Sequence, residues 1–285
     1  MRHIGSQAVD LTVVIPAFNE AERLPRSLPL LLSALAALDA RVEIVLVDDG
    51  SRDQTANVAA EYLSRWRDVK LMRLPWNCGK GAAVRAGVSV ASGAAIVFID
   101  ADLAADIEEL PRLLALLDTA DIAIGSRTKA GAHVEGRTTA RRLGGTVYQS
   151  LVRRLTSATV TDTQCGFKAF QTPVAKLLFS MTTATGFGFD VEILTLAGVL
   201  GFRIAECPIR WTAVDGGHVS LRQHGVGMLQ DLQRARRQQQ NTPLVGWNVP
   251  PQERRPADTT VRVGPTHIRL DAPVTGSAPN LVALG

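Results

Sequence analysis

Two carboxylates stand one residue apart at the end of an apolar run. Residues 96–102 read IVFIDAD, so Asp100 and Asp102 directly follow a stretch with the composition of a buried strand. Side chains at positions i and i+2 of an extended chain point to the same side. Two carboxylates on one side repel each other unless a cation lies between them, and oxygen ligands suit Mg²⁺ or Mn²⁺. Because such ions bind substrate phosphates, the pair predicts a nucleotide diphosphate ligand.

Two other apolar runs also end in polar residues. Asn19 and Glu20 follow LTVVIPAF, and Asp48 and Asp49 follow VEIVLV. One acidic strand end is common, because helix N-caps supply such residues. In an open parallel sheet, however, ligands bind beyond the carboxyl ends of the strands. Three polar ends at one edge therefore favour a ligand site there.

A third cue for phosphate lies in the segment NCGKGAAVRAG. Gly79 and Gly81 would let the backbone approach a ligand at a helix N-terminus, and Lys80 would contact a diphosphate. The alternative is a plain loop with a solvated lysine. The segment is not a P-loop, since GxxxxGK[ST] is absent, and no GxGxxG follows the first strand.

The elements that must hold these residues alternate between strands and helices. Buried strands are predicted at 11–15, 42–50, 69–74, 94–100 and 121–125. Helices are predicted between them at 20–38, after a cap at Ser51 or Asp53, at 79–92 and at 106–117. This order indicates an α/β fold with a mostly parallel sheet flanked by helices.

The second half is less regular and more basic. It predicts a basic helix at 137–155, a short strand at 166–170, a helix at 188–200, strands within 202–211, and a basic helix ending near Gln240. Residues 241–285 are rich in Pro and small residues without periodicity. We expect one domain over residues 1–240 and a disordered tail over 241–285.

Composition narrows the function classes. The chain has 285 residues, a net charge of +4 and three cysteines without a CxxC pair, which predicts reduced thiols rather than a cysteine metal site. No apolar stretch reaches the length of a spanning helix, about 18–20 residues. Local basic clusters favour an anionic ligand or a membrane surface over nucleic acid. We expect a cytoplasmic protein that touches the cytoplasmic face of a membrane through its two basic helices.

At this point the motifs resemble the family 2 glycosyltransferases of GT-A fold. The matching stretches are VVIPAFNE, IVLVDDGSRDQT, NCGKGAAVRAG, FIDAD and GSR. Within that family the chain is most similar to the polyprenyl-phosphate (dolichyl-phosphate) glucosyltransferases, through DTQCGFKAF, FGFDVEIL and CPIRW. The resemblance covers roughly residues 11–235. It implies inverting transfer of a hexose, most simply glucose from UDP-glucose, to a polyprenyl phosphate.

The resemblance also implies roles for individual residues. The uracil or ribose pocket would be lined by residues after the first two strands, with Asp48 beside them: Pro16, Phe18, Glu20 and Asp49. Asp100 and Asp102 would hold the diphosphate through the metal. Arg127 and Arg141 would meet the acceptor phosphate, and Asp162 and Gln164 would lie near the transferred sugar.

The acceptor decides whether a base is needed. A phosphate monoester is already an anionic nucleophile and needs positioning and charge screening, which a basic cluster would supply: Arg127, Lys129, Arg137, Arg141 and Arg142. A hydroxyl acceptor would need a general base, for which Asp190 and Glu192 are candidates. The segment VDGGHVSLRQHG would form a mobile lid carrying His218 and His224.

Other functions stay open at the level of sequence. The same fold could use GDP-mannose, a UDP-N-acetylhexosamine or a soluble acceptor. A non-catalytic nucleotide-sugar-binding protein is a rival from another class, and the intact carboxylate pair argues against it. A nucleotidyltransferase would carry a Gly-rich basic loop after the first strand, where this chain has PAFNEAERLP.

Overall fold

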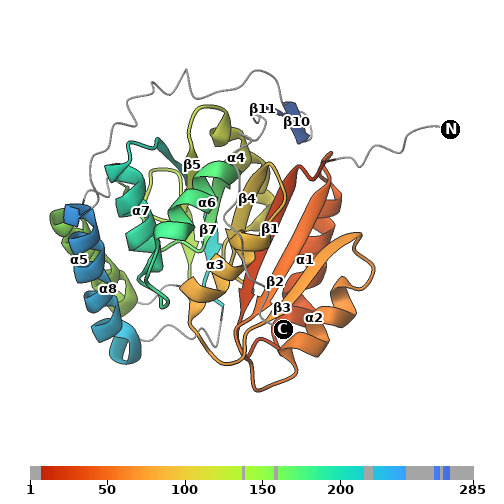
Figure 1. The fold of residues 1–285 in the computed structure, drawn as a ribbon, viewed down its shortest axis with the longest axis horizontal. Coiled ribbons are helices and arrows are strands. Elements are labelled where there is room, and N and C mark those ends of the chain that lie inside the picture. Colours follow the sequence, from red (N-terminus) through yellow and green to blue (C-terminus); the bar gives the residue numbers. More distant parts are fainter. Residues whose placement is uncertain are drawn as a thin grey trace.

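The protein is built around one seven-stranded sheet (Figure 1). The computed structural model describes residues 8–136, 139–156, 160–214, 221–241, 260–263 and 266–269. The strand order is β3-β2-β1-β4-β7-β5-β8. The strands are β1 (Leu11–Ala17), β2 (Val42–Asp48), β3 (Asp68–Arg73), β4 (Ala95–Ile99), β5 (Ile122–Ser126), β7 (Phe167–Gln171) and β8 (Ile204–Pro208).

The prediction of a mostly parallel sheet is confirmed. β1 pairs in parallel with β2 and β4, β2 with β3, and β5 with β8. The exception is β7, which runs antiparallel between β4 and β5. Its first residue, Phe167, lies opposite Ile99, the last residue of β4. The start of β7 therefore meets the carboxyl end of β4, where Asp100 follows.

Helices cover both faces of the sheet. α1 (Leu24–Ala36), α2 (Thr55–Leu63) and α4 (Leu110–Ala115) pack on one face, and α3 (Lys80–Val90), α6 (Thr172–Met181) and α7 (Phe189–Val199) pack on the other. Strand side chains alternate between these two apolar clusters: Val13 and Ile15 face one, and Val14 faces the other. The strands are apolar on both sides because both sides are covered.

Two basic helices lie outside α7. α5 (Thr139–Leu155) and α8 (Leu221–Asn241) lie side by side at the edge of the molecule, where α8 contacts both α5 and α7 (Figure 1). Val152 of α5 and Leu232 and Ala235 of α8 are buried in the cluster that α7 also joins. Among the residues that the structure describes, no helix combines the length and the apolar character needed to cross a bilayer.

Several elements differ from the sequence-based expectation. The first helix starts at Leu24 rather than residue 20, and Pro16 lies inside β1 instead of ending it. The Pro16 ring does not interrupt the strand, since the missing N–H costs a single ladder bond. Residues 106–117 contain α4 between two 3-10 turns, Ile107–Glu109 and Leu116–Asp118. Helix α2 is preceded by Gln54, and Asp53 accepts a hydrogen bond from the Thr55 amide.

Short strands also lie in two segments that we expected to be irregular. β6 (His133–Glu135) and β9 (Arg210–Thr212) form a small parallel pair, so the polar loop predicted at 126–136 is partly extended. In the segment 241–285, which we expected to lack regular structure, β10 (Thr260–Val263) pairs with β11 (Thr266–Arg269), and β11 contacts α4. The division of the chain at residue 240 stays a prediction.

Candidate active site

Asp100 lies at the carboxyl end of β4, against the backbone of the neighbouring strand. Its amide donates a hydrogen bond to the Gly166 carbonyl at 3.1 Å. A Cβ atom placed on Gly166 would lie 1.9 Å from Asp100 Oδ2, so any residue larger than glycine would displace this carboxylate. Asp100 Oδ1 is 2.5 Å from Nζ of Lys80, at the start of α3. Segments far apart in the sequence therefore converge on one carboxylate.

Asp102 follows in a tight turn. Its Oδ1 accepts a hydrogen bond from the Ala104 amide at 3.1 Å, and the Leu103 amide donates to the Asp100 carbonyl at 3.1 Å. Leu103 has φ of 49°, in the left-handed region that a leucine rarely adopts. Burial and the charge of Asp100 both raise the pKa of Asp102. A bound cation would oppose both effects.

The donor set at this edge fits a hard divalent ion that is only partly held by protein. Among the described residues, no group of three or more His, Cys, Asp and Glu side chains is arranged to hold a metal. Asp100 and Asp102 supply carboxylate oxygens, which leaves further positions of the ion to water and substrate. Mg²⁺ bound together with substrate phosphates is commonly held by one or two carboxylates in this way.

Glu20 belongs to the same electrostatic environment. Its side chain is buried and Oε2 lies 2.7 Å from Nε of Arg23. Burial raises the pKa of Glu20 to about 7; Arg23 opposes this, and the charges of Asp102 and Asp100 add to it. The Glu20 amide donates to Thr55 Oγ1. The structure thus brings a third carboxylate near the pair, although the predicted nucleoside contact of Glu20 stays a prediction.

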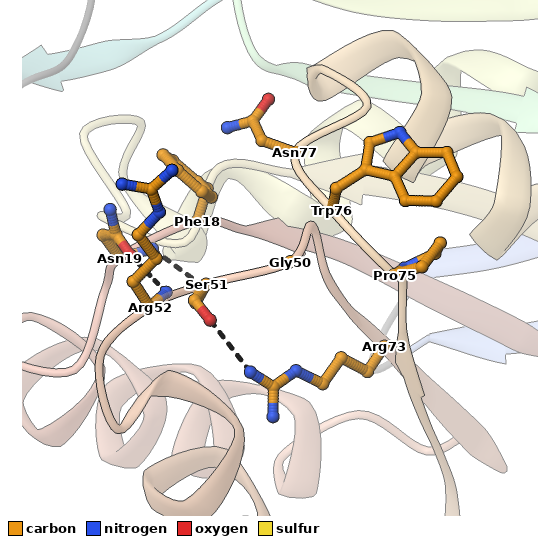
Figure 2. A pocket seen from close by; sticks show the side chains of 9 residues that line it. All are labelled: Phe18, Asn19, Gly50, Ser51, Arg52, Arg73, Pro75, Trp76 and Asn77. Atoms are coloured by element: carbon orange, nitrogen blue, oxygen red, sulfur yellow. Dashed lines mark hydrogen bonds between the residues drawn. The ribbon is translucent and has the colours of Figure 1, made fainter.

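A pocket of about 410 Å³ lies at the ends of the first three strands (Figure 2). Its lining comes from the loops after β1, β2 and β3: Phe18, Asn19, Gly50, Ser51, Arg52, Arg73, Pro75, Trp76 and Asn77. Figure 2 shows Phe18 and Arg52 on one side of the pocket and Trp76 on the other. Asn77 of the lining is three residues before Lys80, the cation that contacts Asp100. The geometry suits a planar ring beside a charged group.

Of the residues predicted for the nucleoside, Phe18 alone is among those lining this pocket. Pro16 is buried within β1. Asp48 is fully buried beneath the pocket, where Oδ1 accepts from the Ser51 amide at 2.9 Å and Oδ2 lies 3.2 Å from Arg73 Nε. Asp48 therefore shapes the turn after β2, and its predicted place beside a bound nucleoside stays a prediction.

Asp49 fixes the loop that leads to Lys80. Its two carboxylate oxygens accept hydrogen bonds from the amides of Cys78 and Gly79, at 2.7 and 2.8 Å. Gly79 has φ of 97°, and a Cβ atom there would lie 2.4 Å from the Thr185 carbonyl oxygen. Glycine is required at this close approach. A direct contact of Asp49 or Gly79 with a ligand stays a prediction.

Asp190 lies in a buried ion pair. Its Oδ1 is 2.5 Å from Nζ of Lys168 on β7, and both side chains are almost fully buried. Lys168 also donates to the Cys165 carbonyl and lies 5.2 Å from the centre of the Phe98 ring. Burial raises the pKa of Asp190, and the charge of Lys168 opposes that rise. This ion pair would have to open before Asp190 could take a proton from an acceptor hydroxyl, and its role as a base stays a prediction.

Glu192, the other candidate base, holds a loop in place. Its carboxylate accepts hydrogen bonds from the Thr183 amide and hydroxyl and from the Ala184 amide, at 2.7–3.1 Å. The side chain is fully buried. This loop continues to Thr185, whose carbonyl accepts from the Gly81 amide at 2.7 Å. Glu192 therefore supports the start of α3, and its role as a base stays a prediction.

Arg127 and Asp162 form a second cation–carboxylate pair at this edge of the sheet. Arg127 Nε and Nη2 donate to the two oxygens of Asp162 at 2.7 and 2.8 Å, and the Arg127 amide donates to Oδ2 at 3.0 Å. The guanidinium also lies 5.6 Å from the centre of the Trp211 ring. Burial acts to raise the pKa of Asp162, but the hydrogen bonds and charge of Arg127 outweigh it and lower the pKa.

Gln164 is tied to this pair. Its amide donates to Asp162 Oδ1 at 3.2 Å, and its side chain donates to the Phe187 carbonyl at 3.3 Å. The predicted neighbours Arg127, Asp162 and Gln164 are thus brought together, whereas their contacts with sugar or acceptor stay predictions.

The basic cluster expected for the acceptor is only partly visible. Lys129 Nζ donates to the Glu206 carbonyl at 2.9 Å, on the side of β8. The remaining predicted residues lie outside the described part, either entirely or by their side chains: Arg137, Arg141, Arg142, His218 and His224.

Sequence reasoning missed Lys168, Gly166 and Trp211. The available signal for Lys168 was its place in the otherwise apolar strand GFKAF. A lysine is rarely buried in a sheet unless a carboxylate pairs with it, so this lysine implied a buried partner. Gly166 and Trp211 gave no local signal, because their partners Asp100 and Arg127 are distant in the chain.

Comparison with known proteins agrees with this geometry. The family model described as "Glycosyl transferase family 2" matches residues 12–179. Curated relatives named dolichyl-phosphate beta-glucosyltransferase include one from Drosophila melanogaster, 36% identical over 75% of this chain and 71% of that protein. Those from Homo sapiens and Saccharomyces cerevisiae are 36% and 32% identical, over 74% and 81% of this chain and 70% and 75% of theirs.

Solved structures support the fold. Glucosyl-3-phosphoglycerate synthase from Mycobacterium tuberculosis in complex with Mg²⁺ and UDP is similar with a TM-score of 0.60 at 20% identity, over 80% of this chain and 79% of that one. The same enzyme with Mn²⁺, UDP and glucosyl-3-phosphoglycerate has a TM-score of 0.59. The sheet, the carboxylate pair after β4, the family match and the relatives agree: the chain belongs to glycosyltransferase family 2.

Proposed function

We propose that this protein transfers glucose from UDP-glucose to a polyprenyl phosphate of the dolichyl type, with Mg²⁺ or Mn²⁺. The observation that carries the proposal is the Asp100–Asp102 pair at the end of β4, reached from the pocket at β1–β3 through Lys80. Relatives named dolichyl-phosphate beta-glucosyltransferase, which share 36% identity over three quarters of the chain, support the choice of donor and acceptor.

The donor would extend from the pocket to the carboxylate pair. Phe18 and Trp76 offer apolar surfaces for the base, and Arg52 and Arg73 offer charge beside it. Asp100 and Asp102 would hold the divalent ion, which supplies charge stabilisation to the leaving diphosphate. Lys80 contacts Asp100 and follows the loop that Asp49 fixes. Its ammonium group would also stabilise the negative charge of the leaving diphosphate.

The buried, paired state of the two candidate bases, Asp190 and Glu192, supports a phosphate acceptor. Asp190 is sealed in its pair with Lys168, and Glu192 holds the loop at Thr183 and Ala184. A phosphate monoester needs no base, because it is ionised near neutral pH, whereas a hydroxyl acceptor would need one. The Nε and Nη2 atoms of Arg127 are used by Asp162, so an acceptor phosphate at this site would meet Nη1.

The basic helices α5 and α8 would place this edge on the cytoplasmic face of a membrane. Arg153 and Arg154 lie in the last turn of α5, and exposed Arg236 and Arg237 lie on α8. Basic residues near an anionic leaflet each contribute about 1 kcal/mol of attraction. Binding to vesicles with and without phosphatidylserine tests this placement.

The function is tested by a donor panel. UDP-glucose, GDP-mannose and UDP-N-acetylglucosamine are each incubated with the protein, Mn²⁺ and a polyprenyl phosphate, and both released nucleotide and lipid-linked sugar are measured. We expect lipid-linked glucose from UDP-glucose. Product from GDP-mannose alone would instead favour the alternative donor. Donor binding without any transfer would favour a non-catalytic sugar-nucleotide-binding protein.

A further inference from the structure

Lys80 forms an ion pair with Asp100, a carboxylate that would also bind the proposed metal ion. Its Nζ lies 2.5 Å from Asp100 Oδ1, and the two side chains are 16% and 37% exposed. The contact joins one pair of atoms, and Asp100 is its more exposed member. An ammonium group and a divalent ion cannot both sit on the same carboxylate oxygen without repelling each other.

A second carboxylate, that of Asp190, lies within electrostatic reach of Lys80. The charge of Lys80 interacts with those of both Asp100 and Asp190. Asp190 is itself held by Lys168, which is fixed by the Cys165 carbonyl and the Phe98 ring. Charges of opposite sign therefore alternate inward from the edge: Asp100, Lys80, Asp190 and Lys168. The two inner members are buried and fixed, and Lys80 is the cation that borders the open site.

The position of α3 keeps Lys80 beside Asp100, three residues after Asn77 of the pocket lining. Asp49 holds the amides of Cys78 and Gly79, and the Thr185 carbonyl holds the amide of Gly81. The backbone on either side of Lys80 is thus fixed. What remains free to move is the flexible side chain, which carries its charge on four methylene groups.

We propose that Lys80 is the resident counter-ion of Asp100 in the free protein and is displaced when the divalent ion and the nucleotide bind together. The inference rests on the proposed metal site at Asp100 and Asp102. In the free protein Lys80 neutralises Asp100 and so weakens binding of the ion. When the diphosphate arrives, the ammonium group transfers its contact from Asp100 to a phosphate oxygen, and Asp100 becomes available to the ion.

This exchange makes ion binding and nucleotide binding cooperative. Each ligand relieves the cost that the other would meet alone, so each must raise the affinity of the other by the same factor. The ion then accumulates at the site only when a donor is present. Lys80 is a positioning residue in this scheme as well as a contact for the diphosphate.

The test measures Mn²⁺ affinity by the electron paramagnetic resonance of free Mn²⁺, with and without UDP. Lys80→Gln and Lys80→Met remove the resident charge, and either serves if the other fails to fold. Both are expected to bind Mn²⁺ about tenfold more tightly than wild type without UDP, as one charged contact no longer competes. The gain in Mn²⁺ affinity on adding UDP should shrink by a similar factor. Lys80→Arg should restore the wild-type pattern.

Two control variants distinguish loss of the Lys80–Asp100 contact from a general loss of positive charge. Arg23 pairs with Glu20 and its charge reaches Asp102, so Arg23→Gln removes a nearby cation that does not sit on Asp100. Lys70 makes a similar contact, 2.6 Å to Glu43, at the opposite end of the strands, and Lys70→Gln controls for loss of any lysine pair. Both variants should bind Mn²⁺ like wild type.

Equal Mn²⁺ affinity of Lys80→Gln and wild type without UDP would overturn the proposal. So would a gain in Arg23→Gln as large as that in Lys80→Gln, because net charge and not contact would then explain the effect. If no variant and no wild type bound Mn²⁺ even with UDP, the metal site itself would fail, and the proposed function would need revision along with this inference.

Discussion

Among the cation–carboxylate pairs at the ligand edge of the sheet, Lys80–Asp100 and Arg127–Asp162 are built differently. Lys80 touches Asp100 through one contact, and 37% of the Asp100 side chain is exposed. Arg127 grips Asp162 through two parallel hydrogen bonds and adds a third from its own amide, and 1% of the Asp162 side chain is exposed. A bidentate buried pair resists exchange, whereas a single contact at an open edge does not.

By this difference the site has an adjustable part, the Lys80–Asp100 pair, and a fixed part, the Arg127–Asp162 pair. The Lys80–Asp100 pair lies between the pocket and the end of β4, where an ion and a diphosphate would enter together. The Arg127–Asp162 pair joins β5 to the segment before β7 and carries Gln164 and Trp211 with it. We infer that the donor side rearranges on binding, while the other side presents a ready-made surface.

The largest effect on transfer activity is expected beside the Lys80–Asp100 pair, because the reaction would depend on the ion held there. Asp102→Asn removes one ligand charge and should lower transfer by about 1000-fold or more while leaving the fold intact. EDTA should do the same to wild type. Activity is measured as lipid-linked sugar formed per minute. Asp39→Asn, which changes an exposed carboxylate after α1, is the matched control. Full turnover in EDTA would contradict a metal-dependent reaction.

The free energy of unfolding should distinguish the two pairs in the opposite order from activity, with the larger loss at the Arg127–Asp162 pair. Asp162→Asn leaves Arg127 buried without its charge partner, and breaking a buried pair typically costs about 3–5 kcal/mol. Asp100→Asn breaks a partly exposed pair and should cost about 1 kcal/mol or less. Urea unfolding of both variants beside wild type measures the difference. Equal losses of unfolding free energy would show that the Arg127–Asp162 pair is not the fixed one.

The pH dependence of stability sharpens the comparison further. The folded pKa of Asp162 is lowered, so its stabilising contribution is present above its unfolded pKa near 3.8 and is lost as the pH falls through the folded pKa. Glu20 behaves oppositely. Its folded pKa is about 7 against 4.5, so the folded state binds the extra proton and stability falls as the pH rises from about 4.5 to 7.

Glu20→Gln should therefore flatten the decline of unfolding free energy between pH 5 and 8. The measurement is urea unfolding at intervals across that range, with Glu22→Gln as a neighbouring control. An unchanged slope in the Glu20 variant would mean that Glu20 is already ionised in the folded protein, as its contact with Arg23 alone would favour.

The smallest effect is expected from removal of the C-terminal segment. Removing residues 242–285 should shift the melting temperature by less than about 2 °C and leave transfer to a water-soluble short-chain acceptor near the wild-type rate. A large fall in melting temperature would show instead that β10 and β11 stabilise the domain through the contact of β11 with α4.

Local pattern was enough to predict most of the sheet. The apolar runs at residues 11–15, 42–50 and 94–100 became β1, β2 and β4, and the polar residues after them share one edge. The antiparallel insertion of β7 was not predictable from such runs, because strand order depends on pairing between distant segments. Helix α6 was missed although Pro173 at its first turn and the spacing of Val174, Leu177 and Leu178 are helical signals.

Residue types at the site were easier to predict than their roles. Asp100, Asp102 and Lys80 stand where a ligand site was expected. Asp190 and Glu192 looked like candidate bases because their partners, Lys168 and the amides of Thr183 and Ala184, come from other elements. A carboxylate's use is decided by burial and by its partner, and neither is written in the local sequence.

A crystal structure of the protein with UDP and Mn²⁺ tests the contrast between the two pairs most directly. The anomalous signal of Mn²⁺ locates the ion independently of the protein atoms. We predict the ion between Asp100 and Asp102, Lys80 on a phosphate oxygen and no longer on Asp100, and the Arg127–Asp162 hydrogen bonds unchanged. An ion elsewhere, Lys80 still on Asp100, or an Arg127 that has left Asp162 would contradict the account.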